Sequence, residues 1–225
     1  MKILVVGSGK LANAILTSDL SFQSCEMLKW ESQHQSLNEK AIIVHAGSGR
    51  QLKECLDFCS KTKSVFIELS TGLETEKMES DFPLIICPNT SILVLKTLYM
   101  LETSGKHFEN YEISITESHQ STKKTEAGTA YAFAHSLKFS PEQIISIRDP
   151  EIQQNKIGIP KEFLDKHAYH KIVIKDGNDE ITIETKVLGH DSYANGVRKI
   201  IETVLKNSLA NKKQTILDLI KNNLL

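Results

Sequence analysis

The first half of the chain alternates between short, continuous apolar runs and stretches in which apolar side chains recur at helical spacing. The apolar runs predict buried strands at residues 2–7, 26–31, 41–47, 64–69 and 83–88. The amphipathic stretches predict helices at residues 10–20 and 50–62. Continuous apolar strands that alternate with helices are typical of a parallel sheet covered on both faces. The connection at residues 32–40 is short, so we expect no full helix there.

The pattern changes after Pro88. Residues 111–119 and 144–149 alternate apolar and polar side chains, as half-buried strands do. Residues 170–187 alternate in the same way around Asp176-Gly177, which predicts a β-hairpin. Helical spacing returns at residues 91–102, 195–207 and 215–225. The sequence therefore predicts an α/β protein: a Rossmann-like parallel-sheet nucleotide domain plus an α+β domain with an open mixed or antiparallel sheet.

Composition narrows the class of protein. The 225 residues are 40% hydrophobic and 24% charged, with a formal net charge of −1, which favours a globular protein and indicates no nucleic-acid partner. There is no apolar segment of about 18 residues, and the apolar run near the start is too short for a signal peptide. We therefore expect a cytoplasmic protein that binds no membrane. The cysteines form no CxxC pair and the histidines show no HExxH spacing, so we expect no metal.

A glycine-rich turn follows the first predicted strand and opens the first predicted helix, at Gly7-Ser8-Gly9-Lys10-Leu11-Ala12. This is the G-x-G-x-x-A form of the dinucleotide fingerprint. Gly7 permits the tight turn, Gly9 lets the backbone approach a pyrophosphate, and the helix start attracts its charge. Glu31 lies at the end of the second strand, where an acidic residue that binds the adenosine ribose is expected. The alternative for Glu31 alone is an exposed carboxylate without a ligand.

Two further short loops follow predicted strands. One begins at Ala46-Gly47 and the other is Ser70-Thr71-Gly72. Ligands of parallel sheets collect at the carboxyl ends of the strands. Both loops suit close approach to a flat ring or a diphosphate, and both also suit plain turns.

The second half of the chain concentrates charge before a predicted helix. Strand parity places Glu117 and His119 on the core face of their strand. A helix is predicted to begin near Gly128-Thr129, and its N–H groups, the Thr129 hydroxyl and the Lys123 ammonium would together receive a carboxylate. His119 would donate a proton near neutral pH. The alternative is a solvated loop.

Several motifs occur in the order of one enzyme family. They are Leu69-Ser70-Thr71-Gly72, Pro88-Asn89-Thr90-Ser91, the run from Glu117 and His119 through Lys123 to Gly128-Thr129-Ala130, and Tyr193-Ala194-Asn195-Gly196-Val197. In these motifs the whole chain resembles the 4-hydroxy-tetrahydrodipicolinate reductase (dihydrodipicolinate reductase) family of lysine and diaminopimelate synthesis. The family reaction is hydride transfer from NADH or NADPH to C4 of a cyclic dicarboxylate, with loss of water.

The resemblance implies roles for individual residues. His119 and Lys123 would donate the proton. The substrate would be held by Gln120, Lys123, Gly128 and Thr129. The cofactor would be bound by the glycine-rich turn, Glu31, Ala46, Gly47, Ser70, Thr71, Gly72, Pro88 and Asn89. The resemblance also implies a dinucleotide-binding domain of residues 1–91 plus 193–225, a substrate-binding and oligomerisation domain of residues 92–192, and a homotetramer or dimer.

The chain departs from the family at three places. Gln120 replaces a second histidine, the run before Gly128 is one residue shorter, and Ser32 stands where a basic residue often follows the ribose acid. Ser32 favours NADH, although Lys29 or Arg50 could still serve NADPH. Two alternatives therefore stay open: a related amino-acid or imino-acid dehydrogenase, and a non-catalytic nucleotide-binding regulatory protein.

Overall fold

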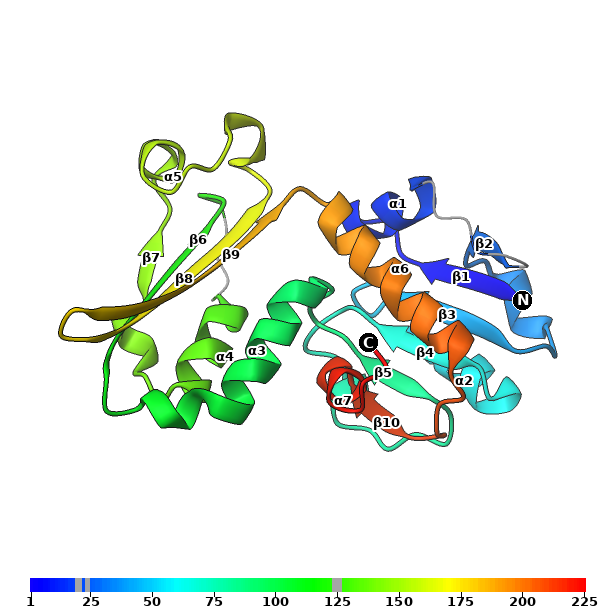
Figure 1. Cartoon of the computed structure of the whole chain (residues 1–225). Coiled ribbons are helices and arrows are strands. Elements are labelled where there is room, and N and C mark those ends of the chain that lie inside the picture. Colours follow the sequence, from blue (N-terminus) through cyan, green and yellow to red (C-terminus); the bar gives the residue numbers. More distant parts are fainter. Residues whose placement is uncertain (19–21, 23–24, 123–126) are drawn as a thin grey trace. The chain divides into compact units, whose positions relative to one another are not determined.

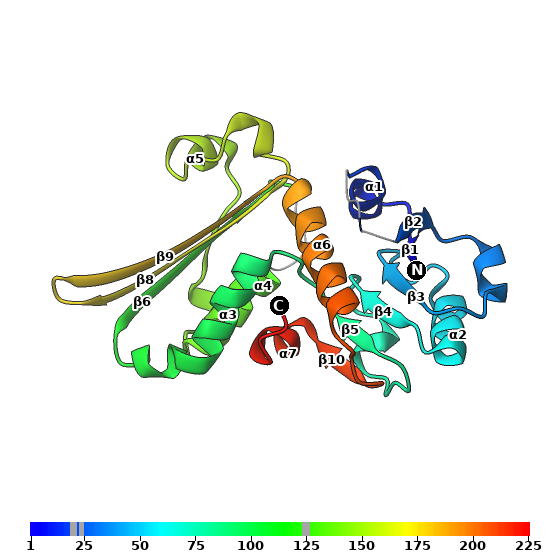
Figure 2. The same ribbon diagram turned by 45° about the vertical axis from the view of Figure 1, so that its right-hand side comes forward.

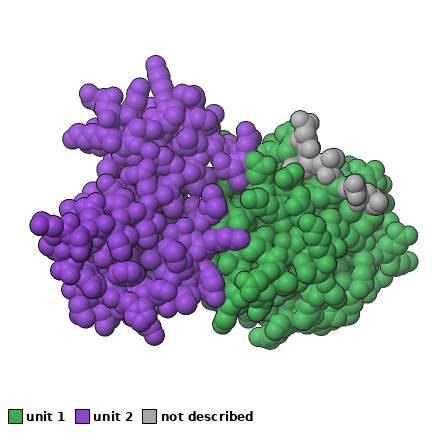
Figure 3. Space-filling model, in the orientation of Figure 1, with its two compact units in different colours: residues 1–92, 193–225 green, residues 93–192 purple. Residues whose placement is uncertain are grey.

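The chain divides into two compact units in the computed structural model, which describes residues 1–18, 22, 25–122 and 127–225 (Figures 1 and 3). Unit 1 consists of Met1–Ile92 and Tyr193–Leu225, and unit 2 is Leu93–Ser192. Lys123, one of the predicted site residues, lies outside the described residues.

Unit 1 contains a six-stranded sheet in the order β10-β5-β4-β3-β1-β2. Its strands are β1 (Lys2–Val6), β2 (Glu26–Lys29), β3 (Ala41–His45), β4 (Val65–Glu68), β5 (Leu84–Ile86) and β10 (Lys213–Thr215). Every pairing between these strands is parallel, which confirms the predicted Rossmann-like sheet. β10 was not predicted, because Lys-Gln-Thr carries no apolar pattern. It joins the sheet by pairing with β5.

Helices of unit 1 bury apolar faces against this sheet. They are α1 (Lys10–Thr17), α2 (Leu52–Thr62), α6 (Asp191–Lys206, which begins in unit 2) and α7 (Ile216–Lys221). Phe58 of α2 packs in one apolar cluster with residues of β1, β3, β4 and β5, whereas α6 crosses the sheet in front of it in Figure 1. The short connection after β2 holds only the 3₁₀ helix η1 (Ser32–Ser36), as expected. A second 3₁₀ helix, η2, spans Glu74–Glu76.

Unit 2 contains a four-stranded sheet in the order β7-β6-β8-β9. Its strands are β6 (Glu112–His119), β7 (Ile145–Ile147), β8 (His167–Asp176) and β9 (Asp179–Leu188). The predicted hairpin is β8–β9, and its turn is Gly177-Asn178, since Asp176 pairs with Asp179. β7 runs parallel to β6, whereas β8 is antiparallel to both β6 and β9, which agrees with the predicted mixed or antiparallel sheet. The sheet is therefore mixed.

The α-helices that the structure describes beside this sheet are α3 (Ile92–Ser104), α4 (Gly128–Ser136) and α5 (Pro150–Asn155). The 3₁₀ helices are η3 (Gly105–Phe108), η4 (Pro141–Gln143) and η5 (Lys161–Phe163). α4 packs against β6, and α3 lies beside α4 in both ribbon views (Figures 1 and 2). Within the described ranges, no helix is long and apolar enough to cross a membrane.

Candidate active site

The glycine-rich turn after β1 depends on the absence of side chains. Gly7 has φ of 124°, and a Cβ added there would lie 2.4 Å from the carbonyl oxygen of Ala46. At Gly9 an added Cβ would meet nothing within 4 Å. Gly9 caps the N-terminus of α1 without a side-chain hydrogen bond, and the first N–H groups of a helix lack partners inside it. The turn therefore offers open space and backbone donors, which fit the pyrophosphate of a dinucleotide.

The other loops predicted to bind the cofactor follow neighbouring parallel strands. Because β1, β3, β4 and β5 are adjacent, their carboxyl ends bring Gly7, Ala46-Gly47, Ser70-Thr71-Gly72 and Pro88-Asn89 to the same edge of the sheet. The backbone N–H of Ser48 donates to Ser70 Oγ over 3.1 Å, which joins the loop after β3 to the loop after β4. This edge is where ligands of such sheets bind.

Glu31 is exposed just after β2 and begins η1. Its carboxylate accepts hydrogen bonds from the backbone N–H of His34 and from the Gln33 amide, the latter over 2.7 Å. The backbone N–H of Glu31 donates to His34 Nδ1 over 2.9 Å. Glu31 is therefore held in place by neutral donors, beside the strand that carries the glycine-rich turn.

In unit 2 the carboxylate of Glu117 lies between the side chains of His119 and Arg148. Its Oε2 is 2.6 Å from His119 Nδ1, and its Oε1 is 2.6 Å from Arg148 Nη2. The side chain of Glu117 is 0% exposed and that of His119 is 13% exposed, so of this pair the histidine is the one that solvent can reach. Arg148 follows β7, the parallel neighbour of β6. Sequence analysis missed Arg148, because it is 31 residues from Glu117 and no local motif marks it.

The surroundings of Glu117 keep it ionised. Burial of the carboxyl group raises its pKa, but hydrogen bonds from His119, Arg148 and Ser146 outweigh burial and lower the pKa to about 2. A carboxylate can only accept at His119 Nδ1, so Nδ1 carries a hydrogen and Nε2 is left for another group. The pair therefore orients His119 as a proton donor through Nε2.

The lowered pKa of Glu117 predicts a pH dependence of stability. Its folded-state value of about 2 is below the ordinary 4.5, so its ionisation stabilises the fold above pH 4.5. That stabilisation is lost as the pH falls from about 4.5 towards 2. Urea unfolding between pH 6 and pH 3 should show a smaller loss of stability in Glu117→Gln than in the wild-type chain. An equal loss in both would contradict the assignment.

Neighbouring side chains fix the position of His119. Gln153, buried on α5, donates from Nε2 to the backbone carbonyl of His119 over 2.7 Å. The His170 ring lies edge-on to the His119 ring, with centroids 5.7 Å apart, and Phe133 of α4 packs edge-on against His170. Elements α4, α5 and β8 thus hold the imidazole at the end of β6. Sequence analysis missed Gln153 and His170 as partners, because both come from distant parts of the chain.

α4 begins at Gly128, as predicted. Its N-cap, Ala127, provides no side-chain hydrogen bond, Gly128 is exposed, and Thr129 is half-buried. Gln120 is half-buried directly after His119. α4 packs against β6, the strand that ends at His119. Backbone N–H groups at a helix start suit a carboxylate.

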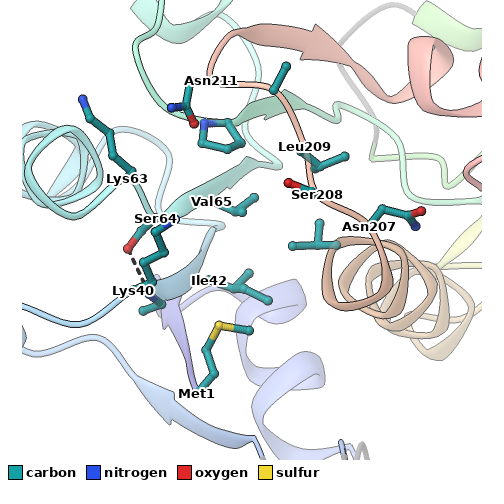
Figure 4. A pocket seen from close by; sticks show the side chains of 14 residues that line it. Met1, Lys40, Ile42, Lys63, Ser64, Val65, Asn207, Ser208, Leu209 and Asn211 are labelled. Carbon is teal, nitrogen blue, oxygen red and sulfur yellow. Dashed lines mark hydrogen bonds between the residues drawn. The ribbon is translucent and has the colours of Figure 1, made fainter.

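A hollow of about 470 Å³ lies at the opposite edge of the unit 1 sheet (Figure 4). Met1, Lys40 and Lys63 are among its lining residues, and they lie just before β1, β3 and β4, at the amino ends of these strands. The glycine-rich turn is at the carboxyl ends, so this hollow is not part of the candidate cofactor site. The described part of the chain holds no cluster of His, Cys, Asp or Glu that could bind a metal.

Comparison with known proteins gives consistent matches. Residues 94–221 match the family model described as "Dihydrodipicolinate reductase, C-terminus". The chain is 26% identical over 195 residues to 4-hydroxy-tetrahydrodipicolinate reductase 1, chloroplastic, of Arabidopsis thaliana, covering 80% of this chain and 56% of that protein. It is 23% identical over 209 residues to 4-hydroxy-tetrahydrodipicolinate reductase of Rickettsia canadensis, covering 85% and 87%. The chain thus spans about half the length of the Arabidopsis relative and most of the Rickettsia relative.

The fold is also similar to a solved structure, described as a dipicolinate-bound dihydrodipicolinate reductase from Paenisporosarcina sp. TG-14. The TM-score is 0.67 at 15% sequence identity, and the match covers 97% of this chain and 98% of that chain. A probable dehydrogenase from Thermotoga maritima matches with a TM-score of 0.51 at 9% identity, covering 92% and 89%. These structural matches concern the fold.

Proposed function

The chain belongs to the dihydrodipicolinate reductase family, and from this we propose that it is an NAD(P)H-dependent oxidoreductase of lysine and diaminopimelate biosynthesis. It would reduce 4-hydroxy-tetrahydrodipicolinate to tetrahydrodipicolinate. The observation that carries the proposal is the buried Glu117 carboxylate beneath His119. A regulatory protein that only binds a nucleotide has no use for an oriented proton donor, so the non-catalytic alternative is disfavoured.

Unit 1 would bind the cofactor, and a bound reduced nicotinamide supplies the hydride. The backbone N–H groups from Gly9 to Leu11 would receive the pyrophosphate at the start of α1. Glu31 would accept hydrogen bonds from the adenosine ribose. The loops at Ala46-Gly47, Ser70-Thr71-Gly72 and Pro88-Asn89 would surround the nicotinamide end. The open space at Gly9 and the close approach of Gly7 to Ala46 support this assignment.

Unit 2 would hold the substrate and supply the proton. The Glu117 carboxylate would hold His119 through Nδ1 and leave Nε2 to donate the proton to the substrate. Lys123 would share this role, as the family resemblance implies. Gln120 and the N–H groups at Gly128-Thr129 would hold a substrate carboxylate. The oriented imidazole and the helix start in one unit support this division of roles.

The cofactor is a nicotinamide dinucleotide, and we propose that NADH is preferred to NADPH. The Glu31 carboxylate would repel a 2′-phosphate, and Ser32 beside it carries no charge to offset that repulsion. The hydrogen bonds to Glu31 from Gln33 and His34 come from neutral groups, which supports the preference.

We propose further that the protein acts in the cytoplasm as a homotetramer, or as a dimer. β9 is an edge strand with an exposed isoleucine, Ile181, and such edges are commonly covered by a partner. Size-exclusion chromatography with light scattering tests this, and a monomer at micromolar concentration would contradict it.

The reaction is tested by supplying freshly made 4-hydroxy-tetrahydrodipicolinate and following oxidation of NADH and of NADPH. We expect turnover with both and a higher kcat/KM with NADH. His119→Ala and Lys123→Ala should each lower kcat by about 100-fold or more, the usual contribution of a general acid. The matched control is His107→Ala, an exposed histidine of η3, which should leave kcat unchanged. Tight binding of the cofactor without turnover would contradict the proposal.

Binding of a dicarboxylate ligand distinguishes the proposed reductase from a related amino-acid or imino-acid dehydrogenase. Pyridine-2,6-dicarboxylate, the dipicolinate in the name of the Paenisporosarcina structure, should raise the melting temperature in the presence of NADH. The absence of a shift would favour the amino-acid or imino-acid dehydrogenase alternative, which Gln120 motivates.

A further inference from the structure

Two ionisable side chains interrupt the apolar strands of unit 1 at the last residues of β3 and β4. His45 and Glu68 are direct neighbours in the strand register, and both side chains are 0% exposed. His45 Nδ1 lies 2.7 Å from Glu68 Oε1. A buried pair adds little to fold stability, because the cost of taking two charges out of water offsets their attraction. Stability alone is therefore a poor reason for this pair.

The second contacts of both side chains reach into the loops that follow the strands. His45 Nε2 lies 3.1 Å from the carbonyl oxygen of Arg50, at the end of the loop after β3. Glu68 Oε1 accepts the backbone N–H of Ser70 over 2.8 Å, at the start of the loop after β4. The imidazole also abuts Gly47, where an added Cβ would lie 2.9 Å from Nε2. The pair thus supports both loops from the protein interior.

The hydrogen-bond partners of His45 determine where the imidazole carries hydrogens. Arg50 offers a carbonyl oxygen, which can only accept, so His45 Nε2 must carry a hydrogen. A second hydrogen lies between His45 Nδ1 and Glu68 Oε1 and is bonded to one of these two atoms. His45 is therefore an obligate bridge between Glu68 and Arg50, and loss of either contact frees one loop.

We propose that His45 and Glu68 are positioning residues that hold the loops at residues 46–50 and 69–72 in the conformation that receives the nicotinamide cofactor. This inference rests on the proposed function, because it concerns the same cofactor site. Neither side chain is exposed to touch a ligand, so the pair acts through the backbone of Arg50 and Ser70. The hydrogen bond from Ser48 N–H to Ser70 Oγ couples the two loops.

Variants of the 225-residue chain can separate this positioning role from a role in stability alone. The double variant His45→Leu/Glu68→Leu replaces the pair with apolar side chains, which commonly preserves folding. His45→Asn is a smaller change, because its amide can still donate to Glu68 but cannot reach Arg50. The matched control is Ser64→Ala, which removes a buried hydrogen bond between Ala41 N–H and Ser64 Oγ at the opposite ends of the same two strands.

The measurements are the Kd of NADH by fluorescence, the KM of each substrate, and the melting temperature. We expect the double variant to raise the Kd and KM of NADH by about tenfold and His45→Asn by about threefold, which are modest losses of binding energy. The KM of the dicarboxylate substrate should stay at the wild-type value. Ser64→Ala should lower the melting temperature and leave the Kd of NADH unchanged.

Two results would overturn the inference in different ways. If both His45→Asn and the double variant bind NADH with wild-type affinity, the pair has no positioning role, and the proposed function is unaffected. If the wild-type chain binds neither NADH nor NADPH, both the proposed function and this inference are contradicted.

Discussion

Glu117→Gln is expected to lower kcat by about 100-fold, comparable with the loss of a general acid. Arg148 can only donate, so the oxygen of the new amide should turn towards Arg148 and its NH₂ group towards His119. His119 Nδ1 would then accept a hydrogen bond instead of donating one, so the imidazole would lose the anionic partner that orients it as a proton donor. Steady-state kinetics with NADH measures the effect.

The matched control for this variant is Glu112→Gln, which changes an exposed glutamate of the same strand, β6. It should leave kcat unchanged. A wild-type kcat in Glu117→Gln would mean that the buried carboxylate does not orient the proton donor.

Gly9→Ala is expected to weaken NADH binding by at least tenfold without loss of stability, a cost of about 1.4 kcal/mol in binding. The added Cβ would meet no protein atom within 4 Å, so the fold can accept it. It would instead occupy the space at the start of α1 where the pyrophosphate is proposed to bind. Isothermal titration with NADH and thermal unfolding measure the two effects separately.

Gly7→Ala gives the contrasting result. Its Cβ would collide with the Ala46 carbonyl oxygen, and its φ of 124° disfavours any side chain. We therefore expect Gly7→Ala to lower the melting temperature as well as the affinity for NADH. Wild-type NADH affinity in Gly9→Ala would show that the cofactor does not approach this turn.

The local features of the fold were predictable from the sequence because their signals are local. The apolar runs identified β1 to β5, the Asp176-Gly177 pair identified the hairpin, and helical spacing identified a helix starting at Gly128. Their physical causes lie within a few residues of each other along the chain. The glycine-rich turn belongs to the same class, since a strand, a turn and a helix start follow one another directly.

Other features required the tertiary structure. β10 has only three residues and no apolar pattern, and it is a strand only because the returning chain pairs with β5. The direction of β7 beside β6 was likewise not encoded in its alternation, since a half-buried strand alternates in the same way in either direction.

The sequence by itself determined which residue types stand at the ends of the strands, and so the class of chemistry: a dinucleotide turn in one unit and a histidine before a helix start in the other. The tertiary structure decided which charges became partners. Arg148 reaches Glu117 across 31 residues, and Glu68 reaches His45 across 23. A buried charge needs a partner. The partner depends on which strands are neighbours in the sheet, and local sequence patterns do not indicate this.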